Sequence, residues 1–370
     1  MPEILLKNIT KKFGDFVAVD NLSMKIEDGD FITLLGPSGC GKTTTLRQIA
    51  GLETPTSGEI YIDGVLVFSS EKLIDISPAK RGVGFLFQNY ALWPHLTVYQ
   101  NIAFGLENNK WSKERIKKRV DELLELLKIS EFIKRYPAEL SGGQQQRVAI
   151  ARTLATNPKV LLMDEPLSNL DAKLRMEMRA ELKRLHKETG ATFVYVTHDQ
   201  LEAMTLATKI CLLKDGLLQM FNSPLDVYLK PLNTFVADFV GSPAINLISF
   251  KYNKIGKHKI KLVNEFFDFS FESNNELPEN LGEEVTIGIR PEYIKVSETG
   301  KFEVEVYTSL PSGMETILGL IMNDSKRINC VVFGANDFSV GNMVKVDFIG
   351  SEIVLFNDQG IFAALGKLLY

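Results

Sequence analysis

The feature that most constrains the fold is a glycine-rich loop that joins an apolar strand to a helix. The loop reads Gly36-Pro37-Ser38-Gly39-Cys40-Gly41-Lys42-Thr43. It satisfies the pattern G-x-x-x-x-G-K-[ST] at every fixed position, after an apolar stretch at residues 31–35 and before a helical stretch at residues 44–50. Glycines let backbone N–H groups turn toward phosphates, and the helix start adds partial positive charge. The loop therefore predicts a nucleotide site in which Lys42 reaches the β/γ-phosphate oxygens and the Thr43 hydroxyl binds Mg²⁺.

A second apolar run, at residues 160–163, ends in the two carboxylates Asp164 and Glu165. A run without polar alternation is typical of a strand buried on both faces of a parallel sheet. Ligands bind at the carboxyl ends of such strands, so both acids are expected beside the phosphate loop. Asp164 is then a candidate for the Mg²⁺ shell, and Glu165 is a candidate to polarise the water that attacks the γ-phosphorus.

Two further strand-like stretches end in polar side chains. Residues 82–87 are followed by Gln88, and residues 192–197 are followed by His198. A lone Gln or His after a strand is usually a satisfied surface group, but four such strand ends favour one shared site. We expect Gln88 to reach the metal or the attacking water, and His198 to contact the γ-phosphate.

Taken in order, these motifs resemble the ATPase subunit of an ATP-binding cassette (ABC) transporter over nearly the whole chain. The signature Leu140-Ser141-Gly142-Gly143-Gln144 and the turn Ser168-Asn169-Leu170-Asp171 complete the family's order. On the residues alone, Ser141 is a good N-cap for the helical run behind it, and its amides and hydroxyl can face an anion. The resemblance implies that this signature covers the ATP held by a second copy, so that two chains bind head to tail. It also implies that Asp171 communicates across that interface.

The resemblance further implies a full set of site residues. Phe13 stands where the family carries an aromatic ring that stacks on adenine, although an aromatic residue near an N-terminal strand is ordinarily part of the core. The nucleotide-binding residues are then Phe13, Gly36, Pro37, Ser38, Gly39, Cys40, Gly41, Lys42, Thr43, Thr44, Ser141, Gly142, Gly143, Gln144 and Asp171. The catalytic residues are Glu165, His198 and Gln88, and the Mg²⁺ ligands are Thr43, Gln88 and Asp164.

The pattern along the chain predicts two domains, as a length of 370 residues suggests. Residues 1–238 alternate strands with helices and are expected to form an α/β P-loop nucleotide-binding domain, with a helical subdomain at about 89–155 that includes an amphipathic helix at 113–127. Residues 239–370 are expected to form an all-β domain like an oligonucleotide/oligosaccharide-binding (OB) barrel, with a regulatory or dimerisation role. Its strands are expected at 259–263, 284–289, 302–308, 328–333, 343–348 and 353–356.

Composition excludes several other classes of protein. The formal net charge of −4 provides no basic field for nucleic acid. No apolar stretch is long enough to span a bilayer, and the N-terminus lacks the pattern of a secretion signal, so we expect a soluble, cytosolic protein. Three widely spaced cysteines, Cys40, Cys211 and Cys330, support neither a disulfide framework nor a zinc site.

The C-terminal part bears on the solute. Residues 288–294, Gly-Ile-Arg-Pro-Glu-Tyr-Ile, resemble the accessory domain on the ATPases of carbohydrate and some ion importers. Residues 241–248 resemble the junction in maltose-type, oligosaccharide and glycerol-phosphate importers, although Ile245 stands where that group usually has Met. The leading hypothesis is an ATPase that drives carbohydrate import. The alternative within the family is a polyamine or metal-ion importer ATPase.

Two other classes of protein fit the sequence less well. A soluble cassette ATPase acting on nucleic acid or ribosomes predicts basic clusters, a second cassette or a coiled-coil insert, and the sequence shows none of these. A sugar-binding domain without enzymatic activity does not account for the complete hydrolytic set.

The resemblance also implies partners and a location. The partners are a second copy, two membrane-spanning permease subunits and, indirectly, an extracytoplasmic solute-binding protein, without nucleic acid. The chain is then expected on the cytoplasmic face of the cell membrane, as a peripheral protein. The aromatic stretch at 90–98 matches the family's groove for a permease helix, and Trp93, His95, Leu96 and Val98 are its candidate lining.

Overall fold

The computed structural model describes residues 3–322 and 326–370 and divides the chain into two compact units, Met1–Pro224 and Leu225–Tyr370. The assignment of separate functions to residues 1–238 and 239–370 stays a prediction. The elements of the first unit are β1 (Ile4–Phe13), β2 (Phe16–Ile26), β3 (Phe31–Leu35), α1 (Lys42–Ala50), β4 (Ser57–Ile62), β5 (Val65–Ser69), β6 (Ile74–Asp75), β7 (Val83–Leu86), α2 (Val98–Asn108), α3 (Lys113–Leu126), α4 (Gly142–Ala155), β8 (Val160–Asp164), α5 (Ala172–Thr189), β9 (Thr192–Val196), α6 (Gln200–Leu206), β10 (Lys209–Lys214) and β11 (Leu217–Asn222).

A six-stranded sheet forms the centre of the first unit. Its order is β11-β10-β3-β9-β8-β7, and every neighbouring pair except β10–β11 is parallel. Every residue of β3, β8 and β9 is buried, because other elements cover both faces of the sheet. In β8, Leu161 and Met163 pack on one face while Val160 and Leu162 pack on the other. The prediction of strands covered on both faces is confirmed.

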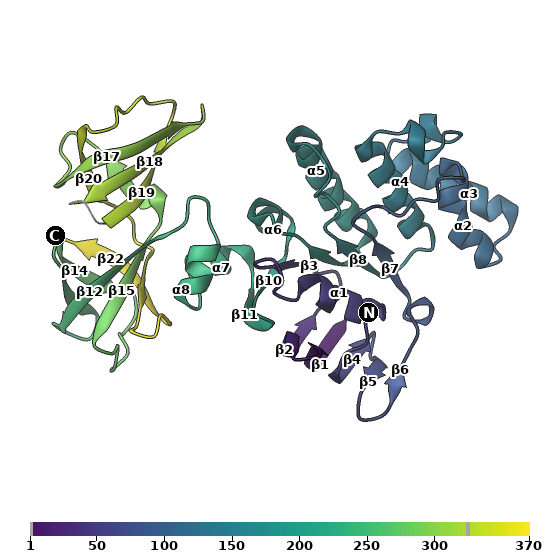
Figure 1. Cartoon of the computed structure of the whole chain (residues 1–370), viewed down its shortest axis with the longest axis horizontal. Helices are drawn as coiled ribbons and strands as arrows, with labels where there is room; N and C mark the ends of the chain where they lie inside the picture. The colour runs from purple at the N-terminus through teal and green to yellow at the C-terminus, as the bar shows by residue number, and fades with distance from the viewer. Residues whose placement is uncertain (1–2, 323–325) are drawn as a thin grey trace. The chain divides into compact units, whose positions relative to one another are not determined.

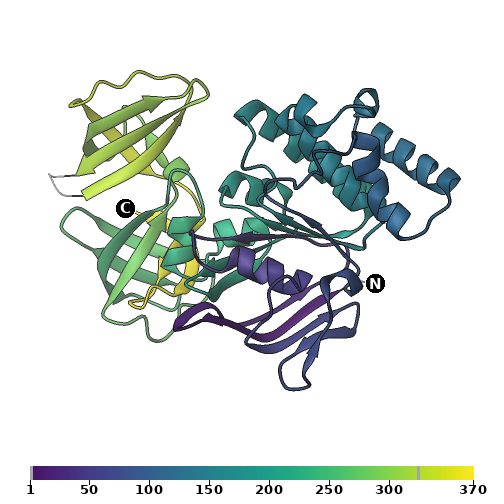
Figure 2. The same ribbon diagram turned by 45° about the vertical axis from the view of Figure 1, so that its right-hand side comes forward.

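The two faces are covered by different elements (Figures 1 and 2). On one face, α1 and the antiparallel sheet β2-β1-β4-β5-β6 share a core with the strands. On the other face, α5 and the helices α2, α3 and α4 share a second core. Because β3, β7, β8 and β9 run parallel, their carboxyl ends meet at one edge of the sheet. The phosphate loop and the three polar strand ends therefore come together, although they are far apart in sequence.

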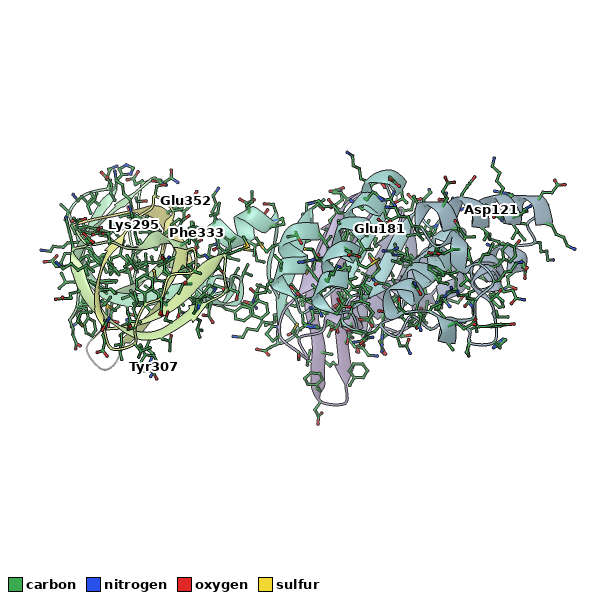
Figure 3. All side chains as sticks on the ribbon, turned by 90° about the horizontal axis from the view of Figure 1, so that it is seen from above. Asp121, Glu181, Lys295, Tyr307, Phe333 and Glu352 are labelled. Carbon is green, nitrogen blue, oxygen red and sulfur yellow. The ribbon has the colours of Figure 1, made fainter. Side chains whose placement is uncertain are left out.

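The helix α3 shows how sequence pattern sets burial in the helical part. Ser112 caps its start by accepting a hydrogen bond from the Arg115 N–H at 3.3 Å. One face buries four apolar side chains, Ile116, Val120, Leu123 and Leu124, while the face that carries Asp121 is exposed (Figure 3). The amphipathic helix predicted at 113–127 is confirmed to within one residue.

The second unit contains two short helices and two β-structures. Its elements are α7 (Pro224–Leu229), α8 (Thr234–Phe239), β12 (Asn246–Lys254), β13 (Lys259–Val263), β14 (Asp268–Ser273), β15 (Glu284–Ile289), β16 (Ile294–Val296), β17 (Phe302–Pro311), β18 (Glu315–Met322), β19 (Lys326–Phe333), β20 (Met343–Phe348), β21 (Ile353–Phe356) and β22 (Phe362–Leu369). Strands β12-β13-β14-β22-β21-β15 close a barrel, and β16-β20-β17-β18-β19 form a separate sheet. The predicted fold class, an α/β P-loop domain with a C-terminal OB-like barrel, is confirmed. The additional five-stranded sheet exceeds the single barrel or sandwich that the sequence pattern predicted.

Arg290 fastens the two short helices to this unit. It is only 2% exposed, and its guanidinium donates to the carbonyls of Ala237 at 3.1 Å, Val240 at 2.5 Å and Tyr228 at 2.7 Å. The guanidinium also stacks on the Tyr228 ring at 3.8 Å. The arginine of the sequence motif at 288–294 therefore satisfies carbonyls at the ends of α7 and α8.

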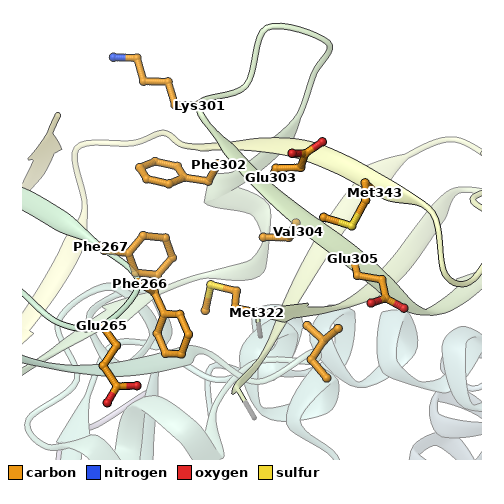
Figure 4. A pocket seen from close by; sticks show the side chains of 11 residues that line it. Glu265, Phe266, Phe267, Lys301, Phe302, Glu303, Val304, Glu305, Met322 and Met343 are labelled. Carbon is orange, nitrogen blue, oxygen red and sulfur yellow. The ribbon is translucent and has the colours of Figure 1, made fainter. Parts of the chain in front are cut away.

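A pocket of about 600 Å³ opens in the second unit (Figure 4). Phe266 and Phe267, in the turn before β14, face Phe302 and Val304 of β17 across it. None of the residues predicted for the nucleotide site lines this pocket. It is therefore distinct from the site described next.

Candidate active site

The phosphate loop leads directly into α1, as the motif predicts. Gly41 occupies the N-cap with a left-handed φ of 99°, and a Cβ there would collide with the Ala18 carbonyl. Lys42 is 7% exposed and donates to the carbonyls of Gly36 at 2.7 Å and Pro37 at 2.9 Å. Its ammonium is therefore held within the loop, where phosphate oxygens of a nucleotide would meet it.

Thr43 and Asp164 form the candidate metal site. The Thr43 hydroxyl donates to Asp164 Oδ1 at 2.8 Å, and Arg47 Nη2 lies 3.5 Å from Asp164 Oδ2. Burial raises the pKa of the Asp164 carboxyl above its ordinary value, and the hydrogen bond from Thr43 opposes that shift. A buried carboxylate beside a hydroxyl is a suitable pair of hard oxygen ligands for Mg²⁺.

Glu165 lies between Gln88 and His198. Gln88 Nε2 donates to Glu165 Oε2 at 3.1 Å, and His198 Nδ1 lies 3.5 Å from the same oxygen. Glu165 adopts a left-handed φ of 45° directly after β8, and this backbone turn carries its side chain away from the strand. The structure thus brings together all three predicted catalytic residues, contributed by the ends of β7, β8 and β9.

A pocket of about 530 Å³ joins these groups to the phosphate loop. Its lining consists of Phe13, Phe16, Ala18, Ser38, Gly39, Cys40, Gly41, Lys42, Thr43, Thr44, Glu165 and His198. Gly36, Pro37, Gln88 and Asp164 are not part of this lining. Pro37 and Asp164 each adjoin a lining residue in the chain, and Gln88 contacts the lining residue Glu165.

Phe16 was missed by sequence reasoning, as were Ala18 and Arg47. Phe13 and Phe16 are partners across the β1–β2 hairpin, and both rings are exposed, by 48% and 59% respectively. Lys11 Nζ lies 4.7 Å from the centre of the Phe13 ring. Gly14-Asp15 between two strand-like runs is a hairpin signal, and that signal could have placed Phe16 beside Phe13.

The signature begins α4 with a capping box. The Gln144 N–H donates to Ser141 Oγ at 3.4 Å, and the Ser141 N–H donates to Gln144 Oε1 at 2.9 Å. Gly143 packs closely on α5, because a Cβ there would lie 2.6 Å from the end of the Leu174 side chain, which would have to shift. Neither Ser141, Gly142, Gly143 nor Gln144 lines the pocket that holds the chain's own phosphate loop.

Asp171 is the N-cap of α5. Its Oδ1 accepts a hydrogen bond from the Leu174 N–H at 2.9 Å. The turn before it is fixed at the active site, since the Ser168 hydroxyl donates to the Glu165 carbonyl at 2.9 Å and Asn169 Nδ2 donates to the Gln88 carbonyl at 3.2 Å. The structure therefore links the turn at 168–171 to the candidate catalytic residues Glu165 and Gln88.

The candidate permease groove requires one correction. Trp93 is partly exposed and packs against Phe104, with ring centres 4.3 Å apart and the ring planes tilted by 39°. Val98 was a candidate lining residue, but it is fully buried, because it begins α2 and packs in the core of the helical part. Phe104, 38% exposed, takes its place on this surface.

Within residues 3–322 and 326–370, no helix is both long and apolar enough to cross a membrane. No group of three or more His, Cys, Asp or Glu side chains in the same ranges is placed to hold a metal ion. The Thr43–Asp164 pair is the candidate metal site, and two side chains leave further ligand positions to phosphate oxygens and water.

Comparison with known proteins identifies the family. The family model described as ABC transporter matches residues 19–168. The maltose/maltodextrin import ATP-binding protein of Vibrio cholerae is 45% identical over 97% of this chain and 96% of its own length. The trehalose/maltose import ATP-binding protein of Thermococcus litoralis is 50% identical over 79% of this chain and 78% of its own length. The Fe(3+) ions import ATP-binding protein of Fusobacterium nucleatum is 47% identical over 80% of this chain and 76% of its own length.

A solved structure agrees with this result. A dimeric ATP-binding cassette in a post-hydrolysis state, bound to ADP and phosphate, superposes with a TM-score of 0.52 at 38% identity, covering 60% of this chain and 98% of that chain. The chain therefore belongs to the ATP-binding proteins of ABC transporters.

Proposed function

We propose that this chain is the ATP-hydrolysing subunit of an importer that takes up a carbohydrate. The observation that carries the proposal is the position of Glu165, which contacts both Gln88 and His198 at the pocket of the phosphate loop. A carboxylate in that position can orient and deprotonate the water that attacks the γ-phosphorus. His198 would contact the γ-phosphate, and Lys42 with the loop amides would hold the β/γ-phosphates.

Mg²⁺ is the proposed companion of ATP. Thr43 and Asp164 would hold the ion, with Gln88 able to reach it, and the ion would neutralise charge on the phosphates. The fit rests on the hydrogen bond of 2.8 Å between Thr43 and Asp164, which shows that the two oxygens converge. Phe13 would stack on the adenine, since its ring is exposed at the same pocket.

A second copy is proposed to complete the site. Ser141, Gly142, Gly143 and Gln144 lie at a helix start, which suits an anion, yet they are not part of the chain's own pocket. The similar cassette of known structure is described as dimeric. In the proposed pair, each signature covers the ATP of the other chain, and Asp171 lies at the shared interface.

The relatives support import of a sugar through permease partners. Those of Thermococcus litoralis and Vibrio cholerae are named for trehalose, maltose and maltodextrin import. We place the chain at the cytoplasmic face of the membrane as a peripheral protein, with two permease subunits and an extracytoplasmic solute-binding protein. Closure of the ATP-bound pair would be transmitted to the permeases through the region after Gln88, and hydrolysis would reset it.

A second candidate is import of a metal ion or polyamine. The relative from Fusobacterium nucleatum, named for Fe(3+) ions, is as similar to this chain as the sugar importers are. The hydrolytic site would be the same, because solute recognition belongs to the binding protein and the permeases.

The test is reconstitution in proteoliposomes with the permeases and binding protein of the same operon. We expect ATP hydrolysis to rise with maltose or trehalose, and Lys42→Ala, with weakened nucleotide binding, to serve as the negative control. A rise with ferric ion or polyamine alone would favour the second candidate. Recovery of the chain with ribosomes instead of permeases would overturn the import proposal.

A further inference from the structure

Arg175 connects the turn at 168–171 with the loop that carries His198. It lies in the first turn of α5, and its Nη2 donates to the Leu170 carbonyl at 3.0 Å. Its Nη1 lies 3.5 Å from Oδ2 of Asp199, the residue that follows His198. The guanidinium thus bridges two segments that both reach the candidate active site. The helices that follow these segments, α5 and α6, lie side by side (Figures 1 and 2).

Glu202 holds the other side of the same loop. It is 3% exposed, and its Oε2 accepts hydrogen bonds from the Thr197 hydroxyl at 2.6 Å and the Tyr195 hydroxyl at 2.7 Å. The Asp199 N–H donates to the Thr197 hydroxyl oxygen at 2.9 Å. The residues on both sides of His198 are therefore held by polar contacts, buried at Thr197 and partly buried at Asp199.

The contact between Arg175 and Glu202 is looser. Their nearest atoms, Nε and Oε1, are 4.0 Å apart, which is beyond hydrogen-bond distance. Among the residues that the structure describes, no hydrogen-bond partner faces the buried Nε of Arg175. A shift of about 1 Å would bring Arg175 Nε and Glu202 Oε1 to hydrogen-bond distance.

We infer that Arg175 is a positioning residue that couples the turn at 168–171 to His198 within one chain. The inference rests on the proposed function, in which Asp171 meets the second copy and His198 contacts the γ-phosphate. Docking of the second copy against the turn would move Leu170, and Arg175 would pass that displacement to Asp199 and Glu202. His198 is then placed correctly only in the assembled pair.

The test compares Arg175→Met with Arg179→Met. Met keeps most of the length of the side chain but removes the guanidinium. Arg179 lies one helical turn further along α5 and has no recorded polar contact among the described residues, so it controls for the loss of charge. We expect Arg175→Met to lower kcat about 10- to 100-fold, the effect of a misplacement near 1 Å, while KM and the Kd for ATP stay unchanged. Arg179→Met should keep wild-type values.

Two more variants distinguish a loss of the Arg175 contacts from misfolding of Arg175→Met. Arg175→Lys should recover part of kcat, because an ammonium can reach Asp199 or the Leu170 carbonyl but not both together. Glu202→Gln keeps its hydrogen-bond acceptor for Tyr195 and Thr197 but loses the charge that faces Arg175, and kcat should also fall.

Equal kcat in wild type, Arg175→Met and Glu202→Gln would overturn the coupling, as would a rise in KM without a change in kcat. If wild type and Arg179→Met both fail to hydrolyse ATP with the permeases present, the proposed function itself is wrong.

Discussion

Replacement of Glu165 by Gln isolates the chemical step from nucleotide binding. The side chain is 23% exposed and contacts Gln88 and His198, whereas the proposed phosphate contacts come from a different part of the pocket lining, the loop at 38–44. Gln has the same length, and its amide oxygen can still accept the hydrogen bond from Gln88. The substitution therefore removes the charge and the basicity but leaves the shape of the site.

The expected loss follows from the contribution of a positioned base. Removal of such a base lowers the rate by about 10²–10⁴-fold, which corresponds to an increase of about 3–5 kcal/mol in the activation barrier. The left-handed backbone at Glu165, with φ of 45°, accepts Gln as readily as Glu, so stability should not change. The Kd for ATP should also stay at its wild-type value, because Lys42 and the loop are untouched.

The assay pairs steady-state ATP hydrolysis with equilibrium nucleotide titration. Glu71→Gln, at an exposed position after β5, is the matched control for loss of one carboxylate and should behave as wild type. Turnover of Glu165→Gln near that of Glu71→Gln would show that Glu165 is not the base. A parallel loss of ATP binding would show that its role is in binding.

Three further predictions follow from other contacts. Phe16→Ala should raise KM for ATP about fivefold without lowering kcat, because Phe16 lines the pocket as the hairpin partner of Phe13 and an aromatic contact there would contribute about 1 kcal/mol. An unchanged KM in steady-state assays would contradict this. Arg290→Met should lower the free energy of unfolding by about 3 kcal/mol in urea titrations, because three carbonyls lose a charged donor, while the relief of a buried charge offsets part of that loss. Equal urea midpoints for wild type and variant would contradict a stabilising role of Arg290. Burial raises the pKa of the Cys330 thiol from 9.0 to about 12, so the unfolded chain releases this proton first and stability falls as pH rises through that window. Cys330→Ala should show a shallower alkaline loss of stability than wild type, and identical slopes would contradict the linkage.

The strands that carry the site were predictable because they are buried on both faces. In a chain with a phosphate loop, the apolar run at 160–163 followed by polar residues indicates a buried strand that ends at the nucleotide site. Strand β8 has the predicted bounds to within a residue. In the C-terminal part, β13, β15, β20 and β21 match their predicted ranges.

The residues that escaped prediction depend on partners distant in sequence. Strand β18 alternates buried and half-buried residues without strong polar positions, so its pattern alone gives no clear period. Val98 lies in an aromatic stretch that was expected at the surface, but it is the first residue of α2 and its side chain packs in the core. The contacts of Arg175 with Asp199 and Glu202 depend on the packing of α5 against α6, so no local sequence pattern predicts them.

Because the site lies at the edge where the parallel strands end, it forms only when the whole sheet has folded. Strands β3, β7, β8 and β9 are separated in sequence by whole helices, so their polar ends meet only after the entire sheet has closed. A partly folded chain then has no pocket that can bind the nucleotide. Because only the folded chain binds it, nucleotide binding shifts the folding equilibrium toward the folded state. In a cell rich in ATP, the substrate would thus also protect its own enzyme from unfolding.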